Sequence, residues 1–177
     1  MRNTALALAA LVLASPAAAD MHLSEPGRYK CDAPAGHFLQ QTIVPLQTGQ
    51  EMRVALRLNE DRSNEKFPAM AVVYFEGPMG KSRVAVGLAK NDRFQVYVAV
   101  RPPGGDSEDA IFAYQLTKNW IILKLNLDKR GYLTVRANEL TRKYKWGQVT
   151  NTFLHCNSGD WDLDVWPRSY VPAQVAP

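Results

Sequence analysis

The chain has 177 residues, with 21 Lys and Arg against 17 Asp and Glu, and a formal net charge of +4. The basic residues are scattered, whereas a nucleic-acid surface needs a dense basic stripe with aromatic residues between the charges, so nucleic acid is excluded as a partner. Zinc spacing of Cys and His is absent, and the G-K-S at 80–82 lacks the spacing of a phosphate loop. We therefore predict neither a metal nor a cofactor.

Residues 1–19 have the pattern of a secretory signal peptide. Arg2 supplies the positive start, residues 5–14 form a short apolar core, and Ala17, Ala18 and Ala19 precede the predicted cleavage point. No later stretch approaches the roughly 20 apolar residues that a membrane-spanning helix needs, so no integral membrane segment is predicted after cleavage. We expect a single domain over 20–177, periplasmic or secreted, in a bacterial-type envelope.

Two cysteines follow the predicted signal, Cys31 and Cys156. In an oxidising compartment such a pair predicts one disulfide, which ties the start of the domain to its end. His155 precedes Cys156, but neighbours on a strand point to opposite faces, which disfavours a catalytic pair.

Apolar residues alternate with polar ones along most of the chain, as in half-buried strands. The run 69–75 is almost continuously apolar and is expected to be a central strand, buried on both faces. We predict about nine strands, at 52–58, 69–75, 83–89, 93–100, 110–116, 120–127, 132–140, 149–156 and 161–166.

Turn residues separate these runs every 8–12 residues or so. The segment "DKRG" (128–131) predicts a tight turn with Gly131 in the left-handed region, which pairs 120–127 with 132–140. Two all-β architectures fit this pattern, an antiparallel β-sandwich and an up-and-down β-barrel of lipocalin type.

The stretch "NWIILKLNLDKRGYLTVRANE" (119–139) resembles a hairpin of concanavalin A-like and laminin-G-like β-sandwich domains. In those domains a tryptophan opens a strand, an acidic–glycine turn follows, and the next strand ends in asparagine. The resemblance covers about 20 residues, and it implies an antiparallel sandwich of concanavalin-like jelly-roll type.

The motif "GDWDLDVWP" (159–167) sets Asp160, Asp162 and Asp164 on one face of its strand. The concanavalin-like family includes glycoside hydrolases whose catalytic strand carries Glu-x-Asp-x-Glu. The resemblance therefore implies Asp160 and Asp164 as nucleophile and acid/base, with Asp162 between them. All three residues are Asp rather than Glu, however, and the strand lies at the end of the chain.

A structural interpretation of the same motif is favoured. Trp161 then faces the core while the three aspartates face water, and their repulsion protects a strand edge. Lys143 and Lys145 have the spacing to balance these charges from a neighbouring strand.

Aromatic residues near both ends of this region suggest a binding surface. Trp146 and Tyr144 alternate on one strand, and Trp166 shares the aspartate face. Core packing is the ordinary role of such residues, but together with Asp162 and Asp164 they form a candidate sugar-binding patch.

These patterns predict an exported, non-enzymatic binding or structural module that recognises a glycan or an envelope protein through a sheet face. One alternative is a glycoside hydrolase that uses Asp160, Asp162 and Asp164. The other is a barrel that holds a small apolar ligand.

Overall fold

The computed structural model of the chain describes residues 20–89, 92–105, 109–115, 120–137 and 140–167. The predicted signal segment, 1–19, lies outside the described residues. In the described part, no helix is long and apolar enough to cross a membrane.

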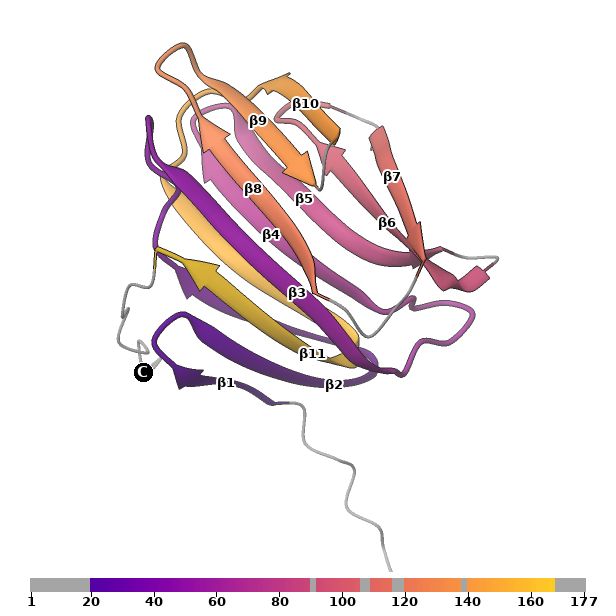
Figure 1. Cartoon of the computed structure of the whole chain (residues 1–177). Coiled ribbons are helices and arrows are strands. Elements are labelled where there is room, and N and C mark those ends of the chain that lie inside the picture. Colours follow the sequence, from indigo (N-terminus) through magenta and orange to yellow (C-terminus); the bar gives the residue numbers. More distant parts are fainter. Residues whose placement is uncertain (1–19, 90–91, 106–108, 116–119, 138–139, 168–177) are drawn as a thin grey trace, which may run out of the picture.

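The described residues form eleven strands (Figure 1). They are β1 (Asp20–Glu25), β2 (Arg28–Ile43), β3 (Glu51–Asp61), β4 (Met70–Gly77), β5 (Gly80–Ala89), β6 (Asp92–Arg101), β7 (Asp109–Gln115), β8 (Ile121–Leu127), β9 (Tyr132–Ala137), β10 (Leu140–Lys145) and β11 (Asn151–Trp166).

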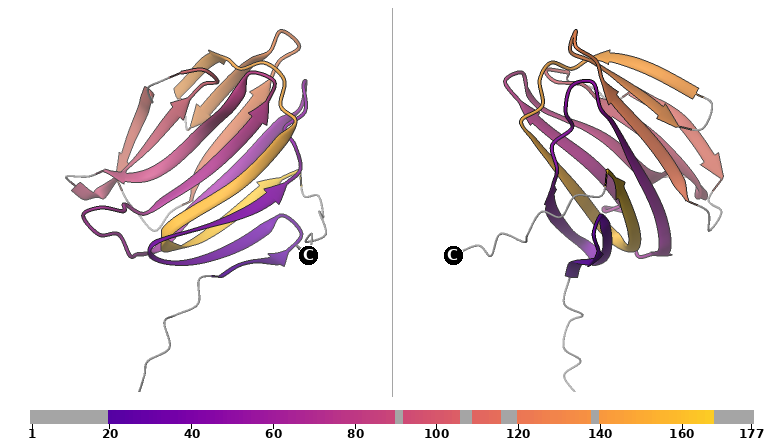
Figure 2. Two further views of the ribbon diagram at one scale, coloured as in Figure 1. Left: turned by 180° about the vertical axis from the view of Figure 1, so that it is seen from behind. Right: turned by 60° about the vertical axis from the view of Figure 1, so that its left-hand side comes forward.

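All pairs are antiparallel, and the order is β10-β9-β8-β3-β11-β4-β5-β6-β7, with β2 on the other side of β11 and β1 beyond it. The sheet folds over on itself into two layers, which Figure 2 shows from behind and from the side. The β3 layer comprises β10, β9, β8, β3 and residues 159–166 of β11. The β4 layer comprises β7, β6, β5, β4 and residues 151–157 of β11.

The long strand β11 therefore belongs to both layers, and it changes layer at Ser158. This residue has a positive φ of 47°, in the left-handed region that non-glycine residues seldom adopt. The backbone N–H of Gly36 donates to its Oγ (3.1 Å), and that of Arg62 donates to its carbonyl oxygen (3.0 Å). Strands β2 and β11 shift register at the same point, so both bend together.

Side chains of alternate residues meet between the layers and form the core. Val73 and Phe75 come from β4, and Leu123 and Leu125 from β8; all four are fully buried. The cysteines are buried as well, and they form the predicted disulfide between β2 and β11.

The predicted all-β sandwich is confirmed, and so is the hairpin at 128–131. Strand β8 pairs with β9. Gly131 has a φ of 75° and donates its N–H to the carbonyl of Asp128 (3.0 Å). The up-and-down connectivity of a barrel is wrong, because β11 inserts between β3 and β4 instead of pairing with its neighbours in sequence.

Several strand limits also differ from the prediction. Strands β1 and β2 precede the first predicted strand, while the predicted strands 149–156 and 161–166 are joined in the single strand β11, which begins at Asn151. Strand β4 is central as expected, and Ala71, Val72 and Val73 are buried in sequence, but Tyr74 on its outer face is half-buried.

Candidate functional site

A groove of about 530 Å³ lies on the outer face of the β4 layer. We call it the His155 groove. It crosses three strands that are adjacent in the sheet, β2, β11 and β4, and reaches β5. Its lining includes Phe38, Gln40, Tyr74, Glu76, Arg83 and His155.

The strand alternation explains why these side chains are available. On β11, Leu154 and Cys156 point into the core, so His155 between them points outward. On β4, Val73 and Phe75 point inward, so Tyr74 points outward. The inner faces of these strands therefore line the core, and their outer faces line the groove.

Three aromatic rings meet at the centre of the groove. The imidazole of His155 lies between Tyr74, at 4.3 Å between ring centroids, and Phe38, at 6.2 Å. The Phe38 ring is nearly parallel to the imidazole, with 10° between the planes. Phe38 is 71% exposed, which is unusual for so large an apolar side chain.

His155 is uncharged at neutral pH. Burial, together with the positive charge of Lys81, lowers its pKa to about 4. A neutral imidazole offers one N–H donor and one acceptor nitrogen.

Charged groups flank the aromatic centre. Arg83 donates an Nη1 hydrogen to the Tyr74 hydroxyl (3.0 Å), and its guanidinium carbon lies 5.9 Å from the centroid of that ring. Lys81 pairs with Glu76 at 3.4 Å, two residues further along the same strands, β5 and β4. The site thus combines apolar ring faces with a few hydrogen-bonding groups, as small-molecule binding sites usually do.

The aromatic surface continues toward β6, because Gly87 has no side chain to block the Tyr97 ring. Gly87 and Tyr97 are register partners, and a Cβ atom on Gly87 would stand 3.0 Å from the Tyr97 hydroxyl. The missing side chain therefore lets the Tyr97 ring lie over β5, on the same outer face as Arg83.

Asp160, Asp162 and Asp164 share the outer face of the β3 layer, but the expectation that they face water at a strand edge is wrong, because Asp164 is buried and β11 lies between other strands. Arg57 binds Asp162 through its Nε and Nη2 atoms, and the Arg28 Nε lies 3.2 Å from Asp164 Oδ2. Lys143, which was expected to balance these charges, instead pairs with Asp128 on the distant β8–β9 turn (2.8 Å). That expectation was wrong because β10 pairs with β9, at the edge of the layer, and not with β11.

The carboxylate of Asp162 is held as an anion by the neighbouring Arg57 guanidinium. Partial burial raises the pKa of Asp162, but hydrogen bonds from Arg57 and Asn59 and the charges of Arg57 and Lys30 outweigh it. The pKa therefore lies below its ordinary value. Proton donation from Asp162 is therefore disfavoured. Asp164 is only 5% exposed.

The aromatic part of the predicted patch does not form. Trp146 is 1% exposed and packs edge-on against Phe75 in the core, with 5.5 Å between centroids. Tyr144 is half-buried against the same core, because its register partner is the inward-facing Leu133. Trp166 does lie on the outer face, 5.1 Å from the guanidinium carbon of Arg53.

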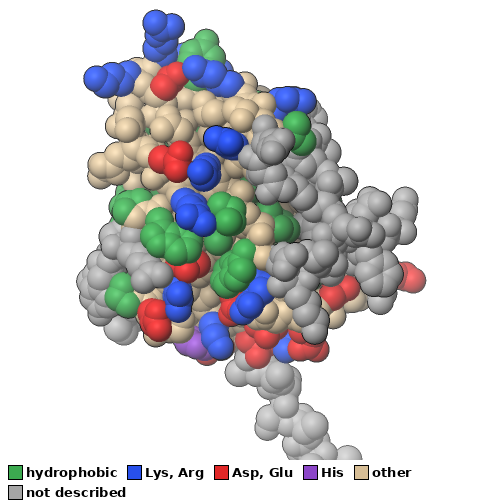
Figure 3. All heavy atoms as spheres, in the orientation of Figure 1, with side chains coloured by type: hydrophobic (Ala, Val, Ile, Leu, Met, Phe, Trp, Pro, Cys, Tyr) green, Lys and Arg blue, Asp and Glu red, His purple; other side chains and the backbone are tan. Residues whose placement is uncertain are grey.

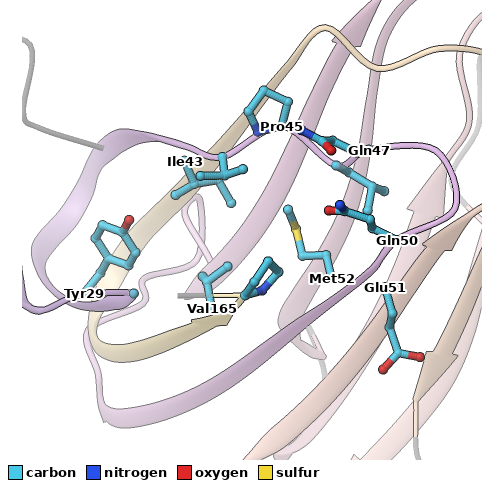
Figure 4. Close-up of a pocket in the computed structure, with 12 residues that line it drawn as sticks. Tyr29, Ile43, Pro45, Gln47, Gln50, Glu51, Met52 and Val165 are labelled. Carbon is cyan, nitrogen blue, oxygen red and sulfur yellow. The ribbon is translucent and has the colours of Figure 1, made fainter. Parts of the chain in front are cut away.

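Another cleft, drawn in Figure 4, lies near the start of β2 and is lined by Tyr29, Ile43, Met52 and Val165, among others. Its volume is about 10 Å³, roughly the space of one water molecule. It is too small to hold a sugar.

The sequence did not identify the residues at the centre of the groove, Phe38, Tyr74 and His155, as functional. Phe38 lies on a strand that was not predicted, and Tyr74 lies in a run interpreted as buried on both faces. The alternation of side chains along a strand indicated that His155 points to the face opposite Cys156. This was the one signal in the sequence for a residue of the groove.

Comparisons with known proteins show the fold class. No protein-family model and no curated protein matches the sequence. Among solved structures, a Crh5 transglycosylase in complex with NAG is 11% identical with a TM-score of 0.53, over 84% of this chain and 74% of that one. A glycoside hydrolase family protein from Mycobacterium thermorestibile is 11% identical with a TM-score of 0.51, over 78% and 75%. The carbohydrate-binding module CBM66 from Bacillus subtilis is 9% identical with a TM-score of 0.48, over 83% and 89%.

At these identities the likeness concerns the backbone. The chain has an antiparallel β-sandwich of the jelly-roll type, and its function must be argued from its own site.

Proposed function

We propose that the protein is an exported glycan-binding module and that the His155 groove is its binding site. One observation carries the proposal: the rings of Phe38, His155 and Tyr74 line a groove of about 530 Å³ on one sheet face. Aromatic faces stack on the apolar faces of sugars, while Arg83 and Glu76 offer a donor and an acceptor for hydroxyl groups.

The lining favours a glycan over an envelope protein as the partner. A protein interface of ordinary stability buries about 800 Å² per partner and centres on a desolvated apolar core. The His155 groove instead has three neighbouring rings with charged groups beside them, which suits a chain of sugar rings lying across the strands.

Export rests on two features of the sequence, the signal-like segment 1–19 and the cysteine pair. A disulfide between Cys31 and Cys156 suits the periplasm or the cell exterior. The proposed mature protein is the single domain over 20–177.

Binding without catalysis is the simpler interpretation of the groove. Glycoside hydrolysis generally needs two carboxyl groups on either side of the scissile bond. Among the groove's lining residues Glu76 alone carries a carboxylate, and Lys81 pairs with it. Asp162 and Asp164 in the β3 layer are ion-paired, and the face that they share with Asp160 lies on the other side of the core.

The test is retention of the protein on a panel of insoluble polysaccharides, including peptidoglycan, chitin and β-glucan. Wild type is compared with Tyr74→Ala and with Trp120→Ala, an exposed aromatic on the opposite layer. We expect Tyr74→Ala to lose about tenfold in affinity, as for one stacked aromatic ring, and Trp120→Ala to bind like wild type. Equal binding by all three proteins, or retention on no polysaccharide, would contradict the proposal.

A further inference from the structure

The side chain of Asn157 carries a buried hydrogen-bond acceptor that no donor satisfies. Cys156 points into the core, so the next residue, Asn157, points outward and lines the His155 groove. Its side-chain oxygen, Oδ1, is buried and has no hydrogen-bond partner among the described residues. Such an acceptor has given up contact with water without gaining a donor from the protein, which is unfavourable. A ligand that brings a donor to this atom would recover that free energy.

Asp162 and Asp164, on the opposite outer face of the sandwich, already have cationic partners. Figure 3 shows that face, on which Lys and Arg side chains lie among Asp and Glu side chains. The Oδ2 atoms of the two aspartates pair with Arg57 and Arg28. The oxygen of Asn157 differs from them, because it belongs to an uncharged amide at a groove.

Two apolar side chains flank Asn157 in the sheet. Phe38 on β2 is its register partner on one side, and Met70 on β4 is its register partner on the other. Side chains that lie opposite each other on adjacent strands have their Cβ atoms about 5 Å apart. Both residues line the groove together with Asn157. The amide therefore lies between a phenyl ring and a thioether chain.

An acetamido group matches this arrangement. It combines an N–H donor, a carbonyl acceptor and a methyl group. The amide of Asn157 offers the acceptor Oδ1 and the donor Nδ2 in return, while Met70 and Phe38 offer apolar contact to the methyl group. A sugar hydroxyl can also donate to Oδ1, but it brings no methyl group to bury against the two apolar side chains.

Phe38 gives such a group a way to reach Asn157. The Oδ1 atom is covered in the structure, but the neighbouring Phe38 side chain is 71% exposed. Exposed side chains change rotamer within nanoseconds, so this ring can turn aside as a ligand enters. His155 lies two residues from Asn157 on the same face of β11, about 7 Å away. A sugar ring on His155 can therefore extend a substituent to Asn157.

We propose that the glycan of the His155 groove contains N-acetylated amino sugars, and that Asn157 binds their acetamido group between Phe38 and Met70. The inference rests on the proposed function, because it names the ligand class of the same groove. It adds that the groove distinguishes an acetamido group from a hydroxyl group at the same position of a sugar.

The experiment titrates the exported protein with chitotetraose and with cellotetraose in a calorimeter. The two tetramers share one β-1,4-linked backbone, and they differ in carrying an acetamido group or a hydroxyl group at carbon 2. The variant Asn157→Leu keeps the approximate shape of the side chain and removes its hydrogen bonding. The control, Gln40→Met, makes the same kind of change at another amide of the groove, one that is exposed to water.

We expect wild type to bind chitotetraose about tenfold more tightly than cellotetraose, as for one additional hydrogen bond. Asn157→Leu should bind the two tetramers alike, while Gln40→Met should keep the wild-type preference. The melting temperature of Asn157→Leu should be at least that of wild type, because an apolar side chain of similar shape replaces an acceptor without a partner.

Equal affinity of wild type for the two tetramers, or tighter binding of cellotetraose, would overturn the inference and leave the groove as a glycan site. Binding of neither tetramer would also overturn it, while the polysaccharide panel tests the proposed function separately. A preference that Asn157→Leu retains, or that Gln40→Met loses to the same extent, would refute the role of Asn157. A melting temperature of Asn157→Leu far below that of wild type would show that Oδ1 serves the fold, and it would refute that role as well.

Discussion

The imidazole of His155 rests against the ring of Tyr74, with 4.3 Å between the ring centroids and 48° between the planes. The two residues come from β11 and β4, which are far apart in sequence but adjacent in the sheet. Phe38 on β2 covers the other side of the imidazole. The rings give the groove its aromatic character, while burial and the charge of Lys81 lower the pKa of His155.

Phe38→Ala is expected to separate binding from stability. Phe38 is 71% exposed, so its truncation should change the free energy of unfolding by less than about 0.5 kcal/mol. Its ring lies at the groove, so affinity for the retained polysaccharide should fall about tenfold. Urea denaturation and calorimetric titration measure the two quantities. Lost stability with unchanged affinity would mean that Phe38 serves the fold.

His155 is expected to make stability depend on pH between about 4 and 6.5. Its folded pKa of about 4 is below the unfolded value near 6.5, so in this window the unfolded chain binds one more proton. The free energy of unfolding should therefore fall as the pH is lowered, by up to about 1.4 kcal/mol per unit. Below about pH 4 this contribution is fully lost.

His155→Gln should flatten that dependence, as measured by urea unfolding at several pH values. The hydrogen bond from Lys143 lowers the pKa of Asp128 to about 2. Asp128 therefore changes the free energy of unfolding with pH only below the ordinary carboxyl range, and it does not interfere with the dependence that His155 causes. An unchanged slope in the variant would show that His155 titrates normally.

Loss of the Cys31–Cys156 disulfide is expected to cost about 2–5 kcal/mol. The bond joins residues 125 apart in sequence, and both cysteines are buried where β2 and β11 serve the two layers. Thermal unfolding with and without reductant, and of Cys31→Ser with Cys156→Ser, measures the effect. A melting temperature that reductant leaves unchanged would contradict a formed bond.

Asp162→Asn is expected to act on stability and not on glycan binding. The change removes the charge that holds Arg57, at a carboxylate whose side chain is 15% exposed, and should cost about 1 kcal/mol. Asp160→Asn is the control on the same face. If Asp162→Asn or its control abolished cleavage of a glycoside, the alternative hydrolase interpretation would replace the binding proposal.

Trp146→Ala is expected to destabilise the fold by about 3–5 kcal/mol, since the indole is fully buried against Phe75. Trp146→Phe keeps much of the apolar volume and should cost less. Chemical denaturation of the two variants gives the comparison. A Trp146→Ala protein of wild-type stability would restore the surface patch that the sequence suggested.

The alternation of apolar and polar residues predicted the layered sheet from the sequence, because each strand has one face in the core. Trp161, Leu163 and Val165 are buried as expected, and the turn at Gly131 followed from its residue types. Strand β2 was missed because Gly36 and Pro34 interrupt its pattern at the bend where it changes layer. The joining of 149–156 to 161–166 was hidden by the same bend at Ser158.

The groove could not be found this way, since it depends on which strands are neighbours. His155 and Tyr74 are 81 positions apart, and only the insertion of β11 beside β4 brings their outer faces together. The aspartates were visible as a motif, but their ion pairs with Arg28 and Arg57 come from strands whose pairing the motif does not encode.

The most direct test of the central claim is an NMR titration of the protein with an oligosaccharide of the retained polysaccharide. We expect the ring signals of His155, Tyr74 and Phe38 to shift and saturate together, while the indole signal of Trp120 on the opposite layer stays in place. Shifts confined to Trp120 and its neighbours, with His155 unmoved at saturation, would contradict it.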